Sequence, residues 1–178
     1  MIKVINKKLK LILVSTPIGY LGSGKGGGVE ITIISLVKGL ILLGHKIMLV
    51  APKGSKLPFE SENLDIIFID GIDQPSWQHQ KKTDPVQIPS NSVLPKSWEV
   101  VIDLSNQYDA VINFAYDWLP LWLTKTTGIK IFHLISMGAE SIVMKEIISE
   151  ISQSFPSQLA FHSHRQSKDY SLKTDPII

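Results

Sequence analysis

The chain has 178 residues, and its 44% hydrophobic content is enough to fill the core of one domain. Charged residues make up only 19% and the formal net charge is +2, so composition gives no reason to expect nucleic acid or an anionic membrane surface as a partner. The absence of cysteine excludes a disulfide framework and thiolate metal ligands, and it favours a cytoplasmic location.

The first half of the chain predicts a strand, a loop, a helix and two more strands. Leu9 to Ser15 is a short apolar run typical of a buried strand, and a glycine-rich loop follows it. Apolar residues then recur at helical spacing from Val29 to Leu43, where Gly44 supplies a left-handed stop. Lysines and glycines interrupt the apolar stretch 31–50, which excludes a membrane span there. "KIMLVAP" and "LDIIFIDG" predict the second and third strands.

Residues 71–95 form the longest predicted loop, because they contain four prolines and show almost no periodicity. Loops of this length inside a domain are uncommon and are often functional. Two interpretations stay open: a lid or recognition loop, and a mobile surface excursion.

The second half alternates helices and strands. We expect helices near 97–107, 118–126 and 140–152, which alternate with the strands "DAVINFA", "IKIFHLIS" and "QLAFHS". This order predicts right-handed crossovers and a parallel sheet covered on both faces, which is a Rossmann-like, doubly wound α/β fold. Ligands of such sheets bind outside the carboxyl ends of the strands, here 15–28, 113–118 and 136–140.

The glycine loop "GYLGSGKGGGVE", residues 19–30, matches parts of two nucleotide motifs. A P-loop needs a hydroxyl after its lysine, but Gly26 follows Lys25. A dinucleotide fold needs an acidic residue where the second strand ends, but Ala51 and Pro52 stand there. Gly26, Gly27 and Gly28 still allow a phosphate to approach backbone amides at a helix start, and we favour this interpretation over a flexible turn without ligand, because three adjacent glycines are costly in an ordinary turn.

The residues from Leu9 to Ser163 resemble the first domain of the GT-B retaining glycosyltransferases. The resemblance rests on the first strand, the "GGGVE" loop, the long helix, Gly-His and the second strand. Within that family, "NFAYDWLPLWLT" and "FHLISMGAES" are most similar to the cyanobacterial UDP-glucose:tetrahydrobiopterin glucosyltransferases. The family has two Rossmann-like domains, of which the first carries much of the acceptor site.

The resemblance implies transfer of glucose from UDP-glucose to a hydroxyl of a reduced pterin, with retention and without a bound metal. Residues 1–164 would be the acceptor-side domain and 165–178 a tail or the start of an interdomain linker. Most of the donor site would belong to a C-terminal Rossmann-like domain that these residues do not include, so we expect the isolated chain to be inactive. A non-catalytic ligand-binding domain, or a subunit that needs a nucleotide-binding partner, is the alternative.

The resemblance also implies a set of site residues. The diphosphate would approach Gly26, Gly27 and Gly28. No catalytic residue is assigned, and Asp117 is the candidate. Contacts with the acceptor or the sugar are expected from seven residues: Glu30, Asn113, Tyr116, Asp117, Met137, Gly138 and Glu140.

Several of these positions also have structural interpretations. Asp117 could bind a ligand group or cap the helix that follows it. Tyr116 could stack on a flat pterin ring, whereas Trp118 and Trp122 have the four-residue spacing of a core pair.

Three histidines and one glycine near the last predicted strands are the remaining candidates. His133 lies in an apolar strand, where a hydrogen-bonded core histidine is the favoured interpretation. Gly138 could admit a ligand to a helix start. His162 and His164 alternate along the last predicted strand, but no third ligand stands at a helpful spacing, so a metal site is not favoured.

Overall fold

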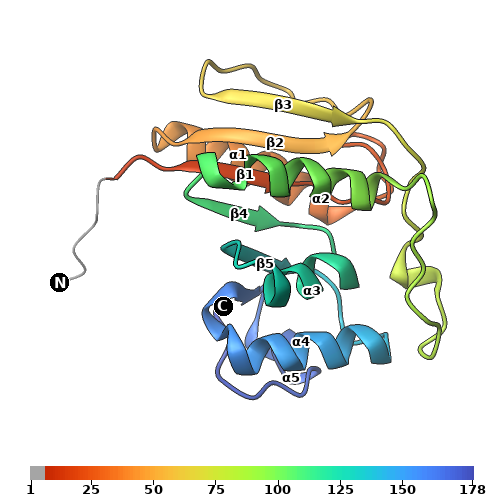
Figure 1. Cartoon of the computed structure of the whole chain (residues 1–178). Helices are drawn as coiled ribbons and strands as arrows, with labels where there is room; N and C mark the ends of the chain where they lie inside the picture. The colour runs from red at the N-terminus through yellow and green to blue at the C-terminus, as the bar shows by residue number, and fades with distance from the viewer. Residues whose placement is uncertain (1–6) are drawn as a thin grey trace.

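A computed structural model describes residues 7–178, so the first six residues of the predicted domain lie outside the described part (Figure 1). Its centre is a single six-stranded sheet in which every neighbouring pair is parallel, with the order β3-β2-β1-β4-β5-β6. This is a Rossmann-like order, and it confirms the α/β prediction. The strands are β1 (Lys10–Val14), β2 (Lys46–Pro52), β3 (Leu64–Ile69), β4 (Ala110–Asn113), β5 (Ile131–Ile135) and β6 (Leu159–Phe161).

Helices connect most of the strands. They are α1 (Gly28–Leu42), α2 (Val93–Leu104), α3 (Trp118–Thr126), α4 (Ile142–Ser154) and α5 (His164–Lys168). Three short 3₁₀ turns, η1 (Trp77–His79), η2 (Ser105–Gln107) and η3 (Pro156–Gln158), lie in the connections. Helices α2, α3 and α4 lie over one face of the sheet and α1 over the other (Figure 1).

The alternation of side chains along each strand explains how both faces are buried. In β1, Ile12 and Val14 belong to the core cluster under α2, while Leu11 and Leu13 pack with Ile33 of α1 on the opposite face. Successive strand residues point to opposite faces, so a strand covered on both sides must be apolar throughout. This is why the short apolar runs of the sequence predicted the strands correctly.

Coverage of the two faces is uneven. No helix joins β2 to β3, and the crossovers α2, α3 and α4 all lie on the same side, so α1 alone packs across the other face. An apolar groove of about 550 Å³ remains beside α1 over the far strands. Its apolar lining includes Leu36, Leu40, Ile112, Phe132, Leu134 and Ala160.

Two helix starts differ from the predicted ones because a serine cap sets each start. Helix α2 begins at Val93, four residues before the predicted position, since Ser92 Oγ accepts a hydrogen bond of 3.1 Å from the Leu94 amide. Pro95 therefore lies in the first helical turn, where a missing N–H costs nothing. Helix α4 begins at Ile142, after the N-cap Ser141, two residues past the start expected near residue 140.

The prediction that His162 and His164 alternate along the last strand is wrong. Strand β6 ends at Phe161, and His164 is the first residue of α5, which Ser163 caps. His162 and His164 therefore do not alternate along one strand. The segment expected to be a tail or linker packs on the domain: Tyr170 is buried, and the Phe161 amide donates to the Ile177 carbonyl at 2.9 Å.

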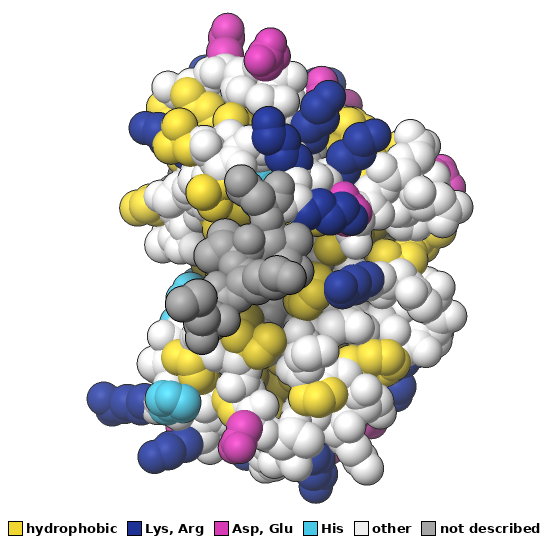
Figure 2. Space-filling view, turned by 90° about the vertical axis from the view of Figure 1, so that its left-hand side faces the viewer, with side chains coloured by type: hydrophobic (Ala, Val, Ile, Leu, Met, Phe, Trp, Pro, Cys, Tyr) yellow, Lys and Arg dark blue, Asp and Glu magenta, His cyan; other side chains and the backbone are white. Residues whose placement is uncertain are grey.

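The edge of the sheet at which the strands begin carries several lysines. Lys10 and Lys46 open β1 and β2, and Lys130 precedes β5. Figure 2 faces this side and shows basic side chains among hydrophobic, acidic and neutral ones. None of the helices in residues 7–178 is long and apolar enough to cross a membrane.

Candidate functional site

A cleft of about 360 Å³ opens at the carboxyl ends of β1, β4 and β5. Strand β1 stands between β2 and β4, so the cleft lies where the sheet order reverses, which is the usual ligand position of this fold. The glycine loop forms one end and an aromatic cluster the other. Its walls include Thr16, Pro17, Lys25, Gly26, Gly27, Gly28, Thr32, Trp77, Phe114, Tyr116, Met137 and His162.

The three glycines predicted to admit a phosphate all line this cleft, but they differ in role. Gly27 is the N-cap of α1 and has φ 54° and ψ −131°, a conformation that favours glycine strongly. A Cβ atom at Gly27 or Gly28 would meet nothing within 4 Å. A Cβ atom at Gly26 would lie 2.9 Å from Glu30 Cγ. Gly27 and Gly28 therefore leave room for a ligand beside the backbone, although the Gly27 amide itself donates to the Gly24 carbonyl at 3.2 Å, while Gly26 makes room for Glu30.

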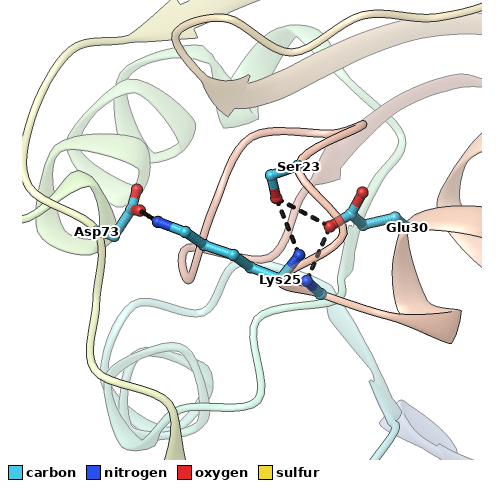
Figure 3. Close-up of polar contacts among 5 residues, drawn as sticks. Ser23, Lys25, Glu30 and Asp73 are labelled. Carbon is cyan, nitrogen blue, oxygen red and sulfur yellow. Dashed lines mark hydrogen bonds and ion pairs between the residues drawn. The ribbon is translucent and has the colours of Figure 1, made fainter.

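Glu30 holds the glycine loop in place. Its buried carboxylate accepts hydrogen bonds from the amides of Gly22 at 2.7 Å, Gly24 at 3.3 Å and Gly26 at 2.8 Å. It also accepts one from the Ser23 hydroxyl at 3.1 Å (Figure 3). Burial alone would raise the pKa of Glu30, but these hydrogen bonds outweigh it and keep the pKa below its usual range. The side chain predicted as a sugar contact is therefore engaged with the loop, and it does not line the cleft.

Lys25 connects the glycine loop to the long loop that follows β3. Its Nζ lies 2.6 Å from Asp73 Oδ2, and both side chains are partly exposed to water (Figure 3). No local pattern in the sequence predicts this contact, because Asp73 lies 48 residues from Lys25.

The long loop after β3 builds one wall of the cleft. The Gln74 amide donates to the Pro17 carbonyl at 2.8 Å, and the Gln74 side-chain oxygen accepts from Ser92 Oγ at 2.8 Å. These contacts place the buried Trp77 of η1 at the cleft. The position of these residues at the cleft suits a recognition loop.

Asp117 acts as a helix cap. Its Oδ1 accepts a hydrogen bond of 2.8 Å from the Trp118 amide, and the side chain is only 1% exposed. Burial raises the pKa of Asp117 to about 6, although the Trp118 amide and the nearby Trp77 indole act in the opposite direction. The carboxyl does not line the cleft, so the capping interpretation describes its place in the structure.

Asn113 belongs to a buried chain of hydrogen bonds under α3. Its Oδ1 accepts from the Ala115 amide at 3.0 Å, which leaves Nδ2 to donate to the Ala115 carbonyl and to His133 Nδ1 at 3.0 Å. His133 Nε2 therefore carries the hydrogen and donates to Thr124 Oγ1 at 2.7 Å, and Thr124 donates to the Pro120 carbonyl. Burial lowers the pKa of His133 to about 3, which keeps the ring neutral. The prediction of a core histidine is confirmed.

Tyr116, Met137, Gly138 and Glu140 gather at the aromatic end. Tyr116 and Met137 line the cleft, while Gly138 and Glu140 line a neighbouring hollow that shares Met137 and Trp77. The Tyr116 hydroxyl lies 3.2 Å from the Gly138 carbonyl, and burial raises its pKa to about 12. Gly138 is not at a helix start, because α4 begins four residues later.

Tyr170 extends this group from the end of the chain, and sequence analysis missed it. Its hydroxyl lies 2.9 Å from the Tyr116 hydroxyl and 2.9 Å from the Met137 carbonyl. Aromatic rings with a satisfied polar tip are typical of binding sites, but nothing in the sequence near Tyr170 forms a motif.

Trp118 and Trp122 stack on each other with ring centroids 5.8 Å apart, as their spacing on α3 predicts. The prediction that both belong to the core is wrong for Trp122, which is 40% exposed. The helix turns this side chain toward water, and stacking on Trp118 covers only one of its faces.

Comparisons with known proteins leave the family open. No family model matches the chain, and no curated protein matches it either. What is established is a Rossmann-like fold with a cleft at its crossover point.

The described residues that line the cleft include few ionisable side chains. The described residues that line it include one lysine and one histidine and no carboxylate. Residues 7–178 contain no group of three or more His, Asp or Glu side chains that could hold a metal ion. The only lysine on the described walls, Lys25, is paired with Asp73, whose carboxylate does not line the cleft.

Proposed function

We propose that the chain is the acceptor-side domain of a GT-B glycosyltransferase that moves glucose from UDP-glucose to a hydroxyl of a reduced pterin, with retention. One observation carries the proposal: a single cleft has a glycine loop with room for a ligand at one end and an aromatic wall at the other. Such a cleft suits a diphosphate at the start of α1 and a flat ring near Trp77 and Tyr116.

The reaction joins the acceptor oxygen to the anomeric carbon of glucose and breaks the bond from that carbon to the diphosphate, and the acceptor hydroxyl gives its proton to the departing diphosphate oxygen. UDP departs with the bonding electrons and must be stabilised by positive partners. The cleft contributes one lysine and the start of α1. We propose that a second domain supplies the other positive groups and most of the donor site, and that these residues alone transfer little or no glucose.

NMR titration of the chain tests the assignment directly. Reduced tetrahydrobiopterin should shift signals of Trp77, Tyr116 and Met137 with weak affinity, and UDP-glucose should bind more weakly and shift Gly27 and Gly28. Tighter binding of UDP-glucose than of the pterin would contradict the acceptor-side assignment. Robust turnover of UDP-glucose by the isolated chain would contradict the need for a second domain.

A non-catalytic ligand-binding domain is the second candidate, and one observation favours it. The carboxylates of Glu30 and Asp117 are engaged with the backbone, His133 is neutral and buried, and no carboxylate among the described residues lines the cleft. Adding a separately produced nucleotide-binding domain to this chain distinguishes the glycosyltransferase from the non-catalytic ligand-binding domain. Restored glucose transfer supports the enzyme, and pterin binding without transfer supports the second candidate.

A further inference from the structure

Lys25 has an unusual place among the residues of the cleft. Among residues 7–178 it is the only lysine on the walls, and it belongs to the glycine loop just before the start of α1. Its ammonium faces the Asp73 carboxylate at 2.6 Å, and the Lys25 and Asp73 side chains are 60% and 39% exposed. Asp73 raises the pKa of Lys25, so the side chain stays positive at physiological pH.

The ion pair between Lys25 and Asp73 adds little to the stability of the fold. Exposed ion pairs contribute about 0–1 kcal/mol, because water screens the charges and two flexible side chains lose freedom. Within residues 7–178, the Asp73 carboxylate has no other side-chain hydrogen bond or ion pair. Both groups can therefore separate at little cost to the folded state.

The surroundings of Lys25 favour an anion on the cleft side. No carboxylate lines the described walls, and a Cβ atom at Gly27 or Gly28 would stand in open space. The amides at the start of α1 add a partial positive charge. An ammonium has three rotatable donors on a flexible stem, so Lys25 can turn from Asp73 toward a phosphate at the glycine loop.

We propose that Lys25 binds a phosphate group of the ligand, and that Asp73 holds the ammonium while the cleft is empty. The Asp73 carboxylate then stands in for the phosphate oxygen that replaces it. This inference rests on the proposed function, since the ligand is taken to be a nucleoside diphosphate. Binding would also release the contact between the glycine loop and the long loop after β3.

The experiment compares K25Q and D73N, two variants that remove the same ion pair. NMR titrations at low salt use UDP, inorganic pyrophosphate and, as a ligand without phosphate, uridine. D84N is the matched control, because Asp84 lies in the same long loop and its side chain contacts the Lys81 amide rather than Lys25.

The two variants should act in opposite directions. D73N frees the ammonium, so UDP and pyrophosphate should bind about 1.5- to 5-fold more tightly, which is the range expected from losing an exposed competing pair. K25Q should weaken both ligands by at least this factor. Uridine should not respond to either variant. In the K25Q background, D73N should give no further gain.

Other outcomes overturn the inference. Changes of the same sign in K25Q and D73N would mean that the pair only supports the loop. An equal gain in D84N would mean a general effect of net charge. If UDP binds and neither variant changes its affinity, the inference fails and the proposed function stands. If neither UDP nor pyrophosphate binds to any variant, both the inference and the proposed function fail. If pyrophosphate binds through Lys25 but UDP does not bind, the inference is supported and the proposed nucleotide ligand is contradicted.

Discussion

The substitution Glu30→Gln tests how the glycine loop is held. In the wild type, one carboxylate oxygen accepts from Gly26 and Ser23, and the other accepts from Gly22 and Gly24. Glutamine has nearly the same shape, but it keeps only one accepting oxygen and directs an NH₂ group at two donors. Two hydrogen bonds to a charged acceptor are therefore lost.

The expected loss of stability follows from these contacts. Two hydrogen bonds to a charged group contribute about 3 kcal/mol at the low end of their range. Glutamine avoids the cost of burying a charge, and the exposed Gly22 and Gly24 can bind water, which returns part of the loss. We expect E30Q to lower the free energy of unfolding by about 2 kcal/mol.

Urea unfolding followed by tryptophan fluorescence measures this change, with E62Q as an exposed control. The pKa of Glu30 is lowered in the folded state, so its contribution is present above the unfolded pKa of 4.5 and is lost as pH falls through the folded pKa. The difference between wild type and E30Q should therefore shrink below about pH 4.5. A loss no larger than that of E62Q, or a difference independent of pH, would refute the role given to Glu30.

Three further predictions concern His133, Asp117 and the glycines. The pKa of His133 falls from 6.5 to about 3 on folding, so the wild type should lose up to about 1.4 kcal/mol per pH unit below pH 6.5, and H133Q should remove that slope. The effect of Asp117 on stability has the opposite sign, because folding raises its pKa from 3.8 to about 6. Its stabilising contribution is fully present below pH 3.8 and is lost as the pH rises through 6. D117N should therefore make the loss of stability on acidification steeper between pH 6 and pH 4. Urea midpoints from pH 4 to pH 7 measure both slopes. G27A should cost about 1–3 kcal/mol, since its φ and ψ suit only glycine, whereas G28A should change stability by less than about 0.5 kcal/mol; equal losses would contradict the backbone argument.

The parts of the fold that could be predicted depend on local signals. Helix α3 was predicted with the bounds it has, because Asp117 is a favoured cap and the apolar pattern begins directly after it. The start of α2 was predicted too late, because Pro95 was read as part of the loop although proline is tolerated in a first turn. The same serine that caps α2 also binds Gln74, which no local pattern reveals.

The candidate site was predicted less completely, for a physical reason. Sequence places Gly27, Tyr116 and Met137 near strand ends, and all three line the cleft. It cannot tell whether a polar side chain turns toward the cleft or back to the chain. Glu30 and Asn113 turn back, because their acceptors and donors are satisfied by nearby backbone groups. Trp77, Asp73 and Tyr170 come from distant segments, and only the folded arrangement brings them to the site.

The buried hydrogen bonds under α3 also fix the register between β4 and β5. Asn113 of β4 is the register partner of His133 of β5. A shift of β5 by one residue would turn His133 to the other face and set Phe132 or Leu134 beside the buried amide. Each buried polar group left without a partner would cost about 1–3 kcal/mol. Strands as apolar as these could otherwise pair in several alignments, so a few polar atoms in the interior decide which one the chain adopts.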